Sequence, residues 1–202
     1  MDQLIDIKKS ARKFAVPILK DSGLTFICSY IKNHNIKRIL EIGTAVGYSA
    51  INFAQLSDDI FVSSIENDIE RYQEAVRNVS DMELSERITL YLGDALTLEL
   101  SGEFDLIFID AAKAQYIKFF EKYKNNLSSD GVIIADNIYF HGMVQDLSLT
   151  HNYSTKKLVK KIRKFIDFLK NNQEFQTDFY DEGDGISVSH RITSTKQDIK
   201  IE

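Results

Sequence analysis

Short apolar runs that alternate with longer amphipathic stretches constrain the fold of this chain most strongly. Each of five runs rich in Ile, Leu, Val and Phe ends at a turn or a polar residue, and helical patterns separate the runs. A strand covered on both faces of a parallel sheet needs a continuous apolar run, whereas the covering helices are amphipathic. The runs predict strands over residues 38–42, 60–66, 88–92, 104–109 and 131–135.

The two ends of the chain have different patterns. Residues 175–192 contain two alternating runs around the turn "EGDG", which predicts an antiparallel hairpin at the edge of the sheet. Two helical patterns precede the first strand, and the only proline, Pro17, lies between them, where a helix break is expected. We expect one α/β domain over residues 1–202, with residues 1–36 as an N-terminal helical extension, because no linker-like stretch divides the chain.

Composition favours a cytoplasmic protein that is not associated with membranes. The single cysteine, Cys28, cannot form an intrachain disulfide, and residues 1–14 mix charged and apolar side chains, which argues against a signal peptide. A net charge of -5 argues against indiscriminate attraction to nucleic acid. However, residues 151–170 carry seven Lys or Arg against one Asp, with apolar side chains at helical spacing. This segment is predicted to be an amphipathic helix with a basic outer face.

A glycine-rich turn, "EIGTAVGYSA", follows the first apolar run. A strand that ends in such a turn and opens a helix typically binds a nucleotide-like ligand, because glycine lets the backbone approach the ligand closely. The dinucleotide fingerprint fails at two of its three glycine positions. An acidic residue with glycines two and six positions later fits Glu41, Gly43 and Gly47, the spacing of the first motif of S-adenosylmethionine-dependent methyltransferases. A tight turn in an unrelated α/β protein is the alternative.

Every predicted parallel strand ends at an acidic residue. Ligands of open parallel sheets bind beyond the carboxyl ends of the strands, so these positions are the candidates for a binding cleft. Helix capping explains any one of them, but like charges crowded together repel unless a cation or hydrogen-bond donors intervene. Of the four histidines, only His141 follows such a strand end closely. The acids are Glu41, Glu66, Asp94, Asp110 and Asp136.

The acids divide into two groups by their expected chemistry. Glu66 follows the glycine turn at a distance that suits hydrogen bonds to the ribose of an adenosine-containing cofactor, either NAD or S-adenosylmethionine. Asp110, Asp136 and Asn137 offer oxygen ligands without a thiolate, which suits a hard cation such as Mg²⁺. Lys113, three residues after Asp110, is a candidate base for a substrate hydroxyl; its alternative role is that of a solvated lysine at a helix start.

Five motifs appear in the order and spacing of one known family. They are "RILEIGTAVGYSAI", "SIENDIERYQEAVRN", "GDAL", "FDLIFIDAAKAQYIKFF" and "GVIIADNIYFHG". Over nearly its whole length the chain resembles the cation-dependent O-methyltransferases, the family of catechol and caffeoyl-CoA O-methyltransferases. The resemblance implies a Rossmann-like methyltransferase fold with a mostly parallel seven-stranded sheet, helices on both faces and a C-terminal antiparallel hairpin.

The resemblance also implies roles for individual residues. The catalytic residues would be Lys113 and Asp110, and the metal ligands Asp110, Asp136 and Asn137. The residues that bind S-adenosylmethionine would be Ile18, Glu41, Gly43, Ser49, Glu66, Asp94, Ala95 and Asp110.

Within the family, the chain most resembles the bacterial branch that methylates tRNA. Ala111 and Ala112 stand where catechol-type members have bulky residues, and "AVPIL" and "IDAAKAQY" are similar to that branch. The resemblance implies Mg²⁺-dependent conversion of wobble 5-hydroxyuridine to 5-methoxyuridine, a tRNA anticodon loop bound near the basic residues 156–164, and a homodimer. Methylation of small catechol-like or caffeoyl-CoA-like compounds is the alternative within the family. An NAD-dependent oxidoreductase and a non-catalytic cofactor-binding module are the alternatives from other classes.

Overall fold

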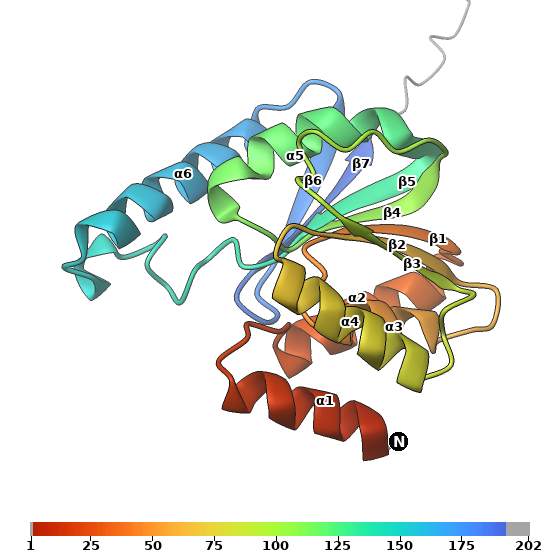
Figure 1. The fold of residues 1–202 in the computed structure, drawn as a ribbon. Coiled ribbons are helices and arrows are strands. Elements are labelled where there is room, and N and C mark those ends of the chain that lie inside the picture. The colour runs from red at the N-terminus through yellow and green to blue at the C-terminus, as the bar shows by residue number, and fades with distance from the viewer. Residues whose placement is uncertain (1, 193–202) are drawn as a thin grey trace, which may run out of the picture.

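A seven-stranded sheet forms the centre of the fold in a computed structural model that describes residues 2–192 (Figure 1). The strand order is β3-β2-β1-β4-β5-β7-β6. Strands β1 to β5 pair in parallel, whereas β7 runs antiparallel to both β5 and β6. The strands are β1 (Arg38–Ile42), β2 (Phe61–Glu66), β3 (Ile88–Leu92), β4 (Phe104–Ile109), β5 (Leu127–Ala135), β6 (Phe175–Tyr180) and β7 (Ile186–Arg191).

Helices cover both faces of this sheet, as predicted. Figure 1 shows α5 and α6 on one face and α2, α3 and α4 on the other, with α1 beyond them. Pro17 lies between α1 and α2, which confirms the predicted break. Within residues 2–192, no helix is long and apolar enough to cross a membrane. The helices are α1 (Asp2–Lys13), α2 (Asp21–Asn33), α3 (Tyr48–Ala54), α4 (Ile69–Asp81), α5 (Tyr116–Tyr123) and α6 (Tyr153–Lys170), and the short 3₁₀ turns are η1 (Lys113–Gln115), η2 (Lys124–Asn126) and η3 (Leu147–Leu149).

Strand β5 differs most from its predicted bounds, and a side-chain cap fixes the start of helix α4. Strand β5 begins four residues earlier than the apolar run, because Leu127 pairs with Phe104 before the register shifts and Leu106 pairs with Val132. Helix α4 begins at Ile69, and Asp68 caps it by accepting hydrogen bonds from the amides of the second and third helical residues. Met1 and residues 193–202, which we included in the predicted domain, lie outside the described residues.

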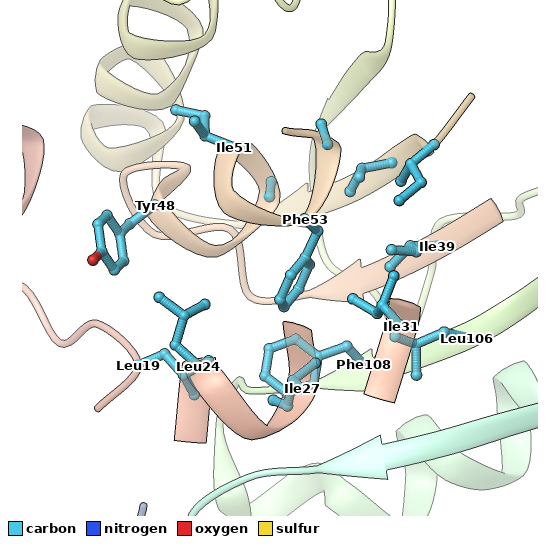
Figure 2. Packing of buried hydrophobic residues seen from close by; sticks show 14 of the residues in the cluster. Leu19, Leu24, Ile27, Ile31, Ile39, Tyr48, Ile51, Phe53, Leu106 and Phe108 are labelled. Carbon is cyan, nitrogen blue, oxygen red and sulfur yellow. The ribbon is translucent and has the colours of Figure 1, made fainter. Parts of the chain in front are cut away.

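Two hydrophobic clusters, one on each face, fix the strands. On one face, Phe53 of α3 packs edge-to-face against Phe108 of β4, and Ile39 of β1 lies nearby (Figure 2). The next residue of β1, Leu40, points to the opposite face, where it joins the cluster that contains Phe120 of α5. Because both faces are covered, these strands are apolar at successive positions, and their carboxyl ends are held rigidly side by side.

Helix α6 has the predicted amphipathic form. It buries Val159, Ile162, Phe165 and Leu169. Four lysines of the predicted basic face are exposed, namely Lys157, Lys160, Lys161 and Lys164. Arg163 differs from them, because its Nε donates a hydrogen bond to the carbonyl oxygen of Val144 at 2.9 Å. The exposed basic surface is therefore made of lysines, and Arg163 fastens the preceding loop to the helix.

Candidate active site

A cavity of about 360 Å³ lies at the carboxyl ends of the parallel strands, around the point where the strand order reverses between β1 and β4. Its volume is within the range of small-molecule sites, and its position is the usual ligand site of an open α/β sheet. Of the predicted site residues, only Glu41 and Asp136 are not part of its wall. Those that line it are Ile18, Gly43, Ser49, Glu66, Asp94, Ala95, Asp110, Lys113 and Asn137.

Gly43 allows β1 and β4 to approach each other at the floor of the cavity. Its φ of 106° is in the region that favours glycine, and a Cβ atom there would overlap the carbonyl oxygen of Asp110. Ala45, two residues later, also has a positive φ, 49°, at the position where a glycine is common in this motif. The glycine turn is therefore a close-approach turn with one strained alanine.

Glu66 holds the glycine turn against the end of β2. One carboxylate oxygen accepts a hydrogen bond from the amide of Ala45 at 2.8 Å, and the other accepts from the amides of Asn67 and Asp68 at 3.0 Å. The side chain is only 5% exposed. Because a carboxylate has about four acceptor positions, one is left for a ligand hydroxyl in the cavity.

Glu41 lies behind the cavity wall. Ser49 and Ser64 each donate a hydrogen bond to its fully buried carboxyl group, and of these two serines only Ser49 faces the cavity. Burial raises the pKa of Glu41 to about 8, while the two serine hydrogen bonds act in the opposite direction. The structure thus gives Glu41 an indirect path to any ligand, through Ser49.

The carboxyl groups of Asp110 and Asp136 and the side-chain amide of Asn137 follow the ends of β4 and β5. Asn137 donates a hydrogen bond to Oδ2 of Asp136 at 2.9 Å, whereas the buried Oδ1 of Asp136 has no hydrogen-bond partner within residues 2–192. Burial raises the pKa of both Asp110 and Asp136, that of Asp136 to about 7, and the charge of Lys113 opposes the shift.

These residues fit a hard cation. An orphaned buried carboxylate oxygen next to a second carboxyl group is costly unless a positive charge neutralises it, and oxygen ligands suit Mg²⁺. Within residues 2–192, no group of three or more His, Cys, Asp and Glu side chains is arranged to hold a metal, and this site has only two carboxyl groups beside the Asn137 side chain. Asp110, Asp136 and Asn137 therefore form the candidate metal site.

Lys113 begins η1 at the edge of this site. Its Nζ lies 5.9 Å from the ring centroid of Phe140 and its side chain lines the cavity. His141 does not line the cavity; its ring is mostly exposed, and its Nδ1 lies 3.2 Å from a carboxylate oxygen of Asp184. Lys113 thus lines the same cavity as Asp110 and Asn137, which Glu66 also lines.

Several residues of the wall were not predicted. Tyr48 directly follows the glycine turn, and Asn67 directly follows Glu66. Their position next to predicted site residues in the sequence could therefore have identified them. Phe119 projects from α5, and its apolar character did not distinguish it from the core. Outside the wall, Asp184 lies 43 residues from its partner His141, and no local pattern joins them.

Comparisons with known proteins agree with one family. A model of the O-methyltransferase family matches residues 2–192. A protein from Staphylococcus aureus, provisionally named caffeoyl-CoA O-methyltransferase, has a similar structure, with a TM-score of 0.90, 35% identity, and coverage of 94% of this chain and 92% of that chain. A catechol O-methyltransferase from Niastella koreensis is 34% identical over 137 residues, 64% of this chain and 59% of that protein. A methyltransferase from Podospora anserina, solved with S-adenosylhomocysteine bound, shares the fold at a TM-score of 0.86 and 23% identity, over 95% of this chain and 88% of that one.

Proposed function

Because the chain belongs to the O-methyltransferase family, we propose that it transfers a methyl group from S-adenosylmethionine to a ring hydroxyl in the cavity at the strand ends. The observation that carries this proposal is the juxtaposition in one cavity of the glycine turn and Glu66 with Asp110, Asn137 and Lys113. An NAD-dependent oxidoreductase would need the glycine turn and Glu66, but its reaction does not require Asp110, Asn137 and Lys113. The S-adenosylhomocysteine in the related Podospora structure supports the choice of cofactor.

The cofactor is bound by the wall that the glycine turn forms. Glu66, already fixed by three backbone amides, accepts a hydrogen bond from the ribose, and Ala95 and Ile18 provide contact surface. Ser49 faces the cofactor and is oriented by Glu41 behind it. Most of the binding groups are thus held in place before the cofactor enters, which reduces the entropy lost on binding.

The acceptor is held at the other end of the cavity. Asp110, Asp136 and Asn137 would hold Mg²⁺, which would supply positive charge that lowers the pKa of the acceptor hydroxyl. With its Nζ as the neutral amine, Lys113 would take the proton from that hydroxyl and become the ammonium. The acceptor oxygen then forms a bond to the methyl carbon as the carbon–sulfur bond breaks, and S-adenosylhomocysteine leaves. Well-oriented reactants in one cavity can gain roughly 7–11 kcal/mol from proximity.

The acceptor that we propose is 5-hydroxyuridine at the wobble position of tRNA. Its ring hydroxyl lies beside a carbonyl oxygen, so both oxygens suit a cation site. Ala111 and Ala112 leave the cavity mouth without bulky side chains, and α6, which carries the exposed lysines, packs against the turn that begins at Lys113. A phosphate backbone has a use for this basic surface, whereas a small neutral acceptor does not.

The second candidate is a small catechol-like or caffeoyl-CoA-like acceptor, which the names of the two bacterial relatives favour. One experiment separates the two. The protein is incubated with labelled S-adenosylmethionine, Mg²⁺ and tRNA from cells that lack the protein, and the nucleosides are identified after digestion. Labelled 5-methoxyuridine supports the tRNA function, and label in catechol or caffeoyl-CoA alone supports the second candidate. We also propose that the protein is a homodimer, which light scattering tests; a monomer at all working concentrations contradicts it.

A further inference from the structure

The segment that follows β5 has an unusual backbone. Three of its non-glycine residues, Asn137, Phe140 and His141, have φ values of 61°, 47° and 57°, in the left-handed region. Side chains disfavour this region, most strongly when they are bulky, as in Phe140. Such conformations persist only where the surrounding structure holds them, and they concentrate at functional sites. Because Asn137 belongs to the candidate metal site, what holds this segment matters for the chemistry.

The turn between β6 and β7 holds the segment. The amides of Ile138 and Tyr139 donate hydrogen bonds to the carbonyl oxygens of Gly185 and Asp184, at 3.0 and 2.8 Å. The amide of His141 donates to both carboxylate oxygens of Asp184, at 2.7 and 2.9 Å. Three of the segment's amides are therefore fastened to one turn, and the last of them to a side chain.

The Asp184 carboxylate is buried and lies close to two basic side chains. It is 7% exposed, and His141 Nδ1 and Lys20 Nζ lie 3.2 and 3.7 Å from its oxygens. A buried carboxylate is costly unless hydrogen bonds and positive groups compensate for its lost hydration. Its hydrogen bonds with the His141 amide are charge-assisted, and such hydrogen bonds are stronger than neutral ones.

The same turn also contacts the start of α2, and residues just before that helix line the cavity. The amide of Gly183 donates a hydrogen bond to Ser22 at the start of α2, and Lys20 follows the cavity-lining residue Leu19. A Cβ atom on Gly183 would lie 3.3 Å from Gly23 and 3.6 Å from Oδ1 of Asp136, so the turn packs against both α2 and the candidate metal site.

We propose that Asp184 is a positioning residue of the methyl transfer. By binding the amide of His141 it holds residues 137–141 in their strained conformation, and thereby places Asn137 beside Asp136 and Phe140 beside Lys113. The catalytic consequence rests on the function proposed above, whereas the anchoring of the segment does not.

The test uses Asp184→Ala with Glu182→Ala as the matched control, since Glu182 is an exposed acid of the same turn. Hydrogen exchange reports on the His141 amide, with the amide of Ile134 in β5 as a reference for global stability. We expect Asp184→Ala to speed exchange at His141 but not at Ile134. Mn²⁺ affinity and kcat should each fall about 10–100-fold, as when the support of a metal ligand is removed. Affinity for S-adenosylhomocysteine should change less than about twofold.

A second variant keeps the proposal testable if Asp184→Ala does not fold. Asp184→Asn retains one acceptor for the His141 amide and should keep most of its protection and of kcat. Unchanged exchange at His141 in the Ala variant would overturn the anchor. Faster exchange with unchanged Mn²⁺ affinity and unchanged kcat would overturn the positioning role. If the wild type transfers no methyl group to any acceptor, the proposed function fails, and exchange and Mn²⁺ binding still decide the role of Asp184.

Discussion

Replacing Glu41 with Gln should make the free energy of unfolding depend less on pH between about 4.5 and about 8. The Glu41 carboxyl group is fully buried, and its pKa is raised from 4.5 to about 8, chiefly by burial. At pH values between about 4.5 and about 8, the folded protein therefore keeps a proton on Glu41 that the unfolded chain has released. Because the folded state binds more protons in this window, the free energy of unfolding falls as pH rises from about 4.5 to about 8, and it has no further dependence on Glu41 above that.

The size of the effect follows from the shift. The pKa of Glu41 is higher in the folded than in the unfolded state by about 8 - 4.5 = 3.5. At about 1.4 kcal/mol for a pKa difference of one, the whole difference corresponds to about 5 kcal/mol. Between pH 5 and pH 8, the part that Glu41 contributes is about 3–4 kcal/mol. Asp110 and Asp136 also have raised pKa values, but they are present in both proteins, so the difference between wild type and Glu41→Gln isolates Glu41.

Urea denaturation at pH 5, 6.5 and 8 with EDTA, followed by far-ultraviolet circular dichroism, measures this difference. The wild type should lose about 3–4 kcal/mol more than Glu41→Gln from pH 5 to pH 8. Glu103→Gln, which changes an exposed glutamate before β4, should behave as the wild type does. Parallel stability curves for the wild type and Glu41→Gln would refute the reasoning, because Glu41 would then ionise equally in both states.

Three further predictions concern the turn, the cation and the basic surface. Gly43→Ala should destabilise the protein by more than about 2 kcal/mol in urea denaturation, because a Cβ atom would overlap the Asp110 carbonyl oxygen at a positive φ; an unchanged midpoint would contradict this. EDTA should abolish methyl transfer but leave calorimetric binding of S-adenosylhomocysteine largely intact, and full activity in EDTA would remove the case for a cation. Changing Lys160, Lys161 and Lys164 to Ala should flatten the dependence of log tRNA affinity on log salt by about 0.7 for each phosphate that a lysine no longer neutralises, and the idea fails if the slope stays the same.

The sequence predicted the sheet well where burial acts on local patterns. Strands covered on both faces have to be apolar at successive positions. Ile39 and Leu40 therefore predict β1, although their side chains pack into different clusters. The extension of β5 was not predictable in this way, because Ser128, Ser129 and Asp130 are polar and lie at the register shift between the Leu127–Phe104 pair and the Val132–Leu106 pair.

The site was predictable to the extent that strand ends determine it. The positions of Glu66 and Asp110 in the cavity wall were predictable because parallel strands bring their carboxyl ends to one edge. The place of Glu41 behind Ser49 depends on Ser64 of the neighbouring strand. The proposed anchoring role of Asp184 depends on the contact between the β6–β7 turn and the segment after β5. Both are long-range contacts of polar side chains, and spacing along the chain does not encode them.

Calorimetric titration with S-adenosylhomocysteine and with NAD tests the central claim most directly, because the claim is that this cavity binds the cofactor of a methyltransferase. The wild type should bind S-adenosylhomocysteine and not NAD. Glu66→Ala should weaken that binding by about 1–3 kcal/mol, because a ribose hydroxyl loses its buried acceptor and the Ala45 amide loses its own. Circular dichroism would confirm that the variant is folded. Binding of NAD without binding of S-adenosylhomocysteine would contradict the account.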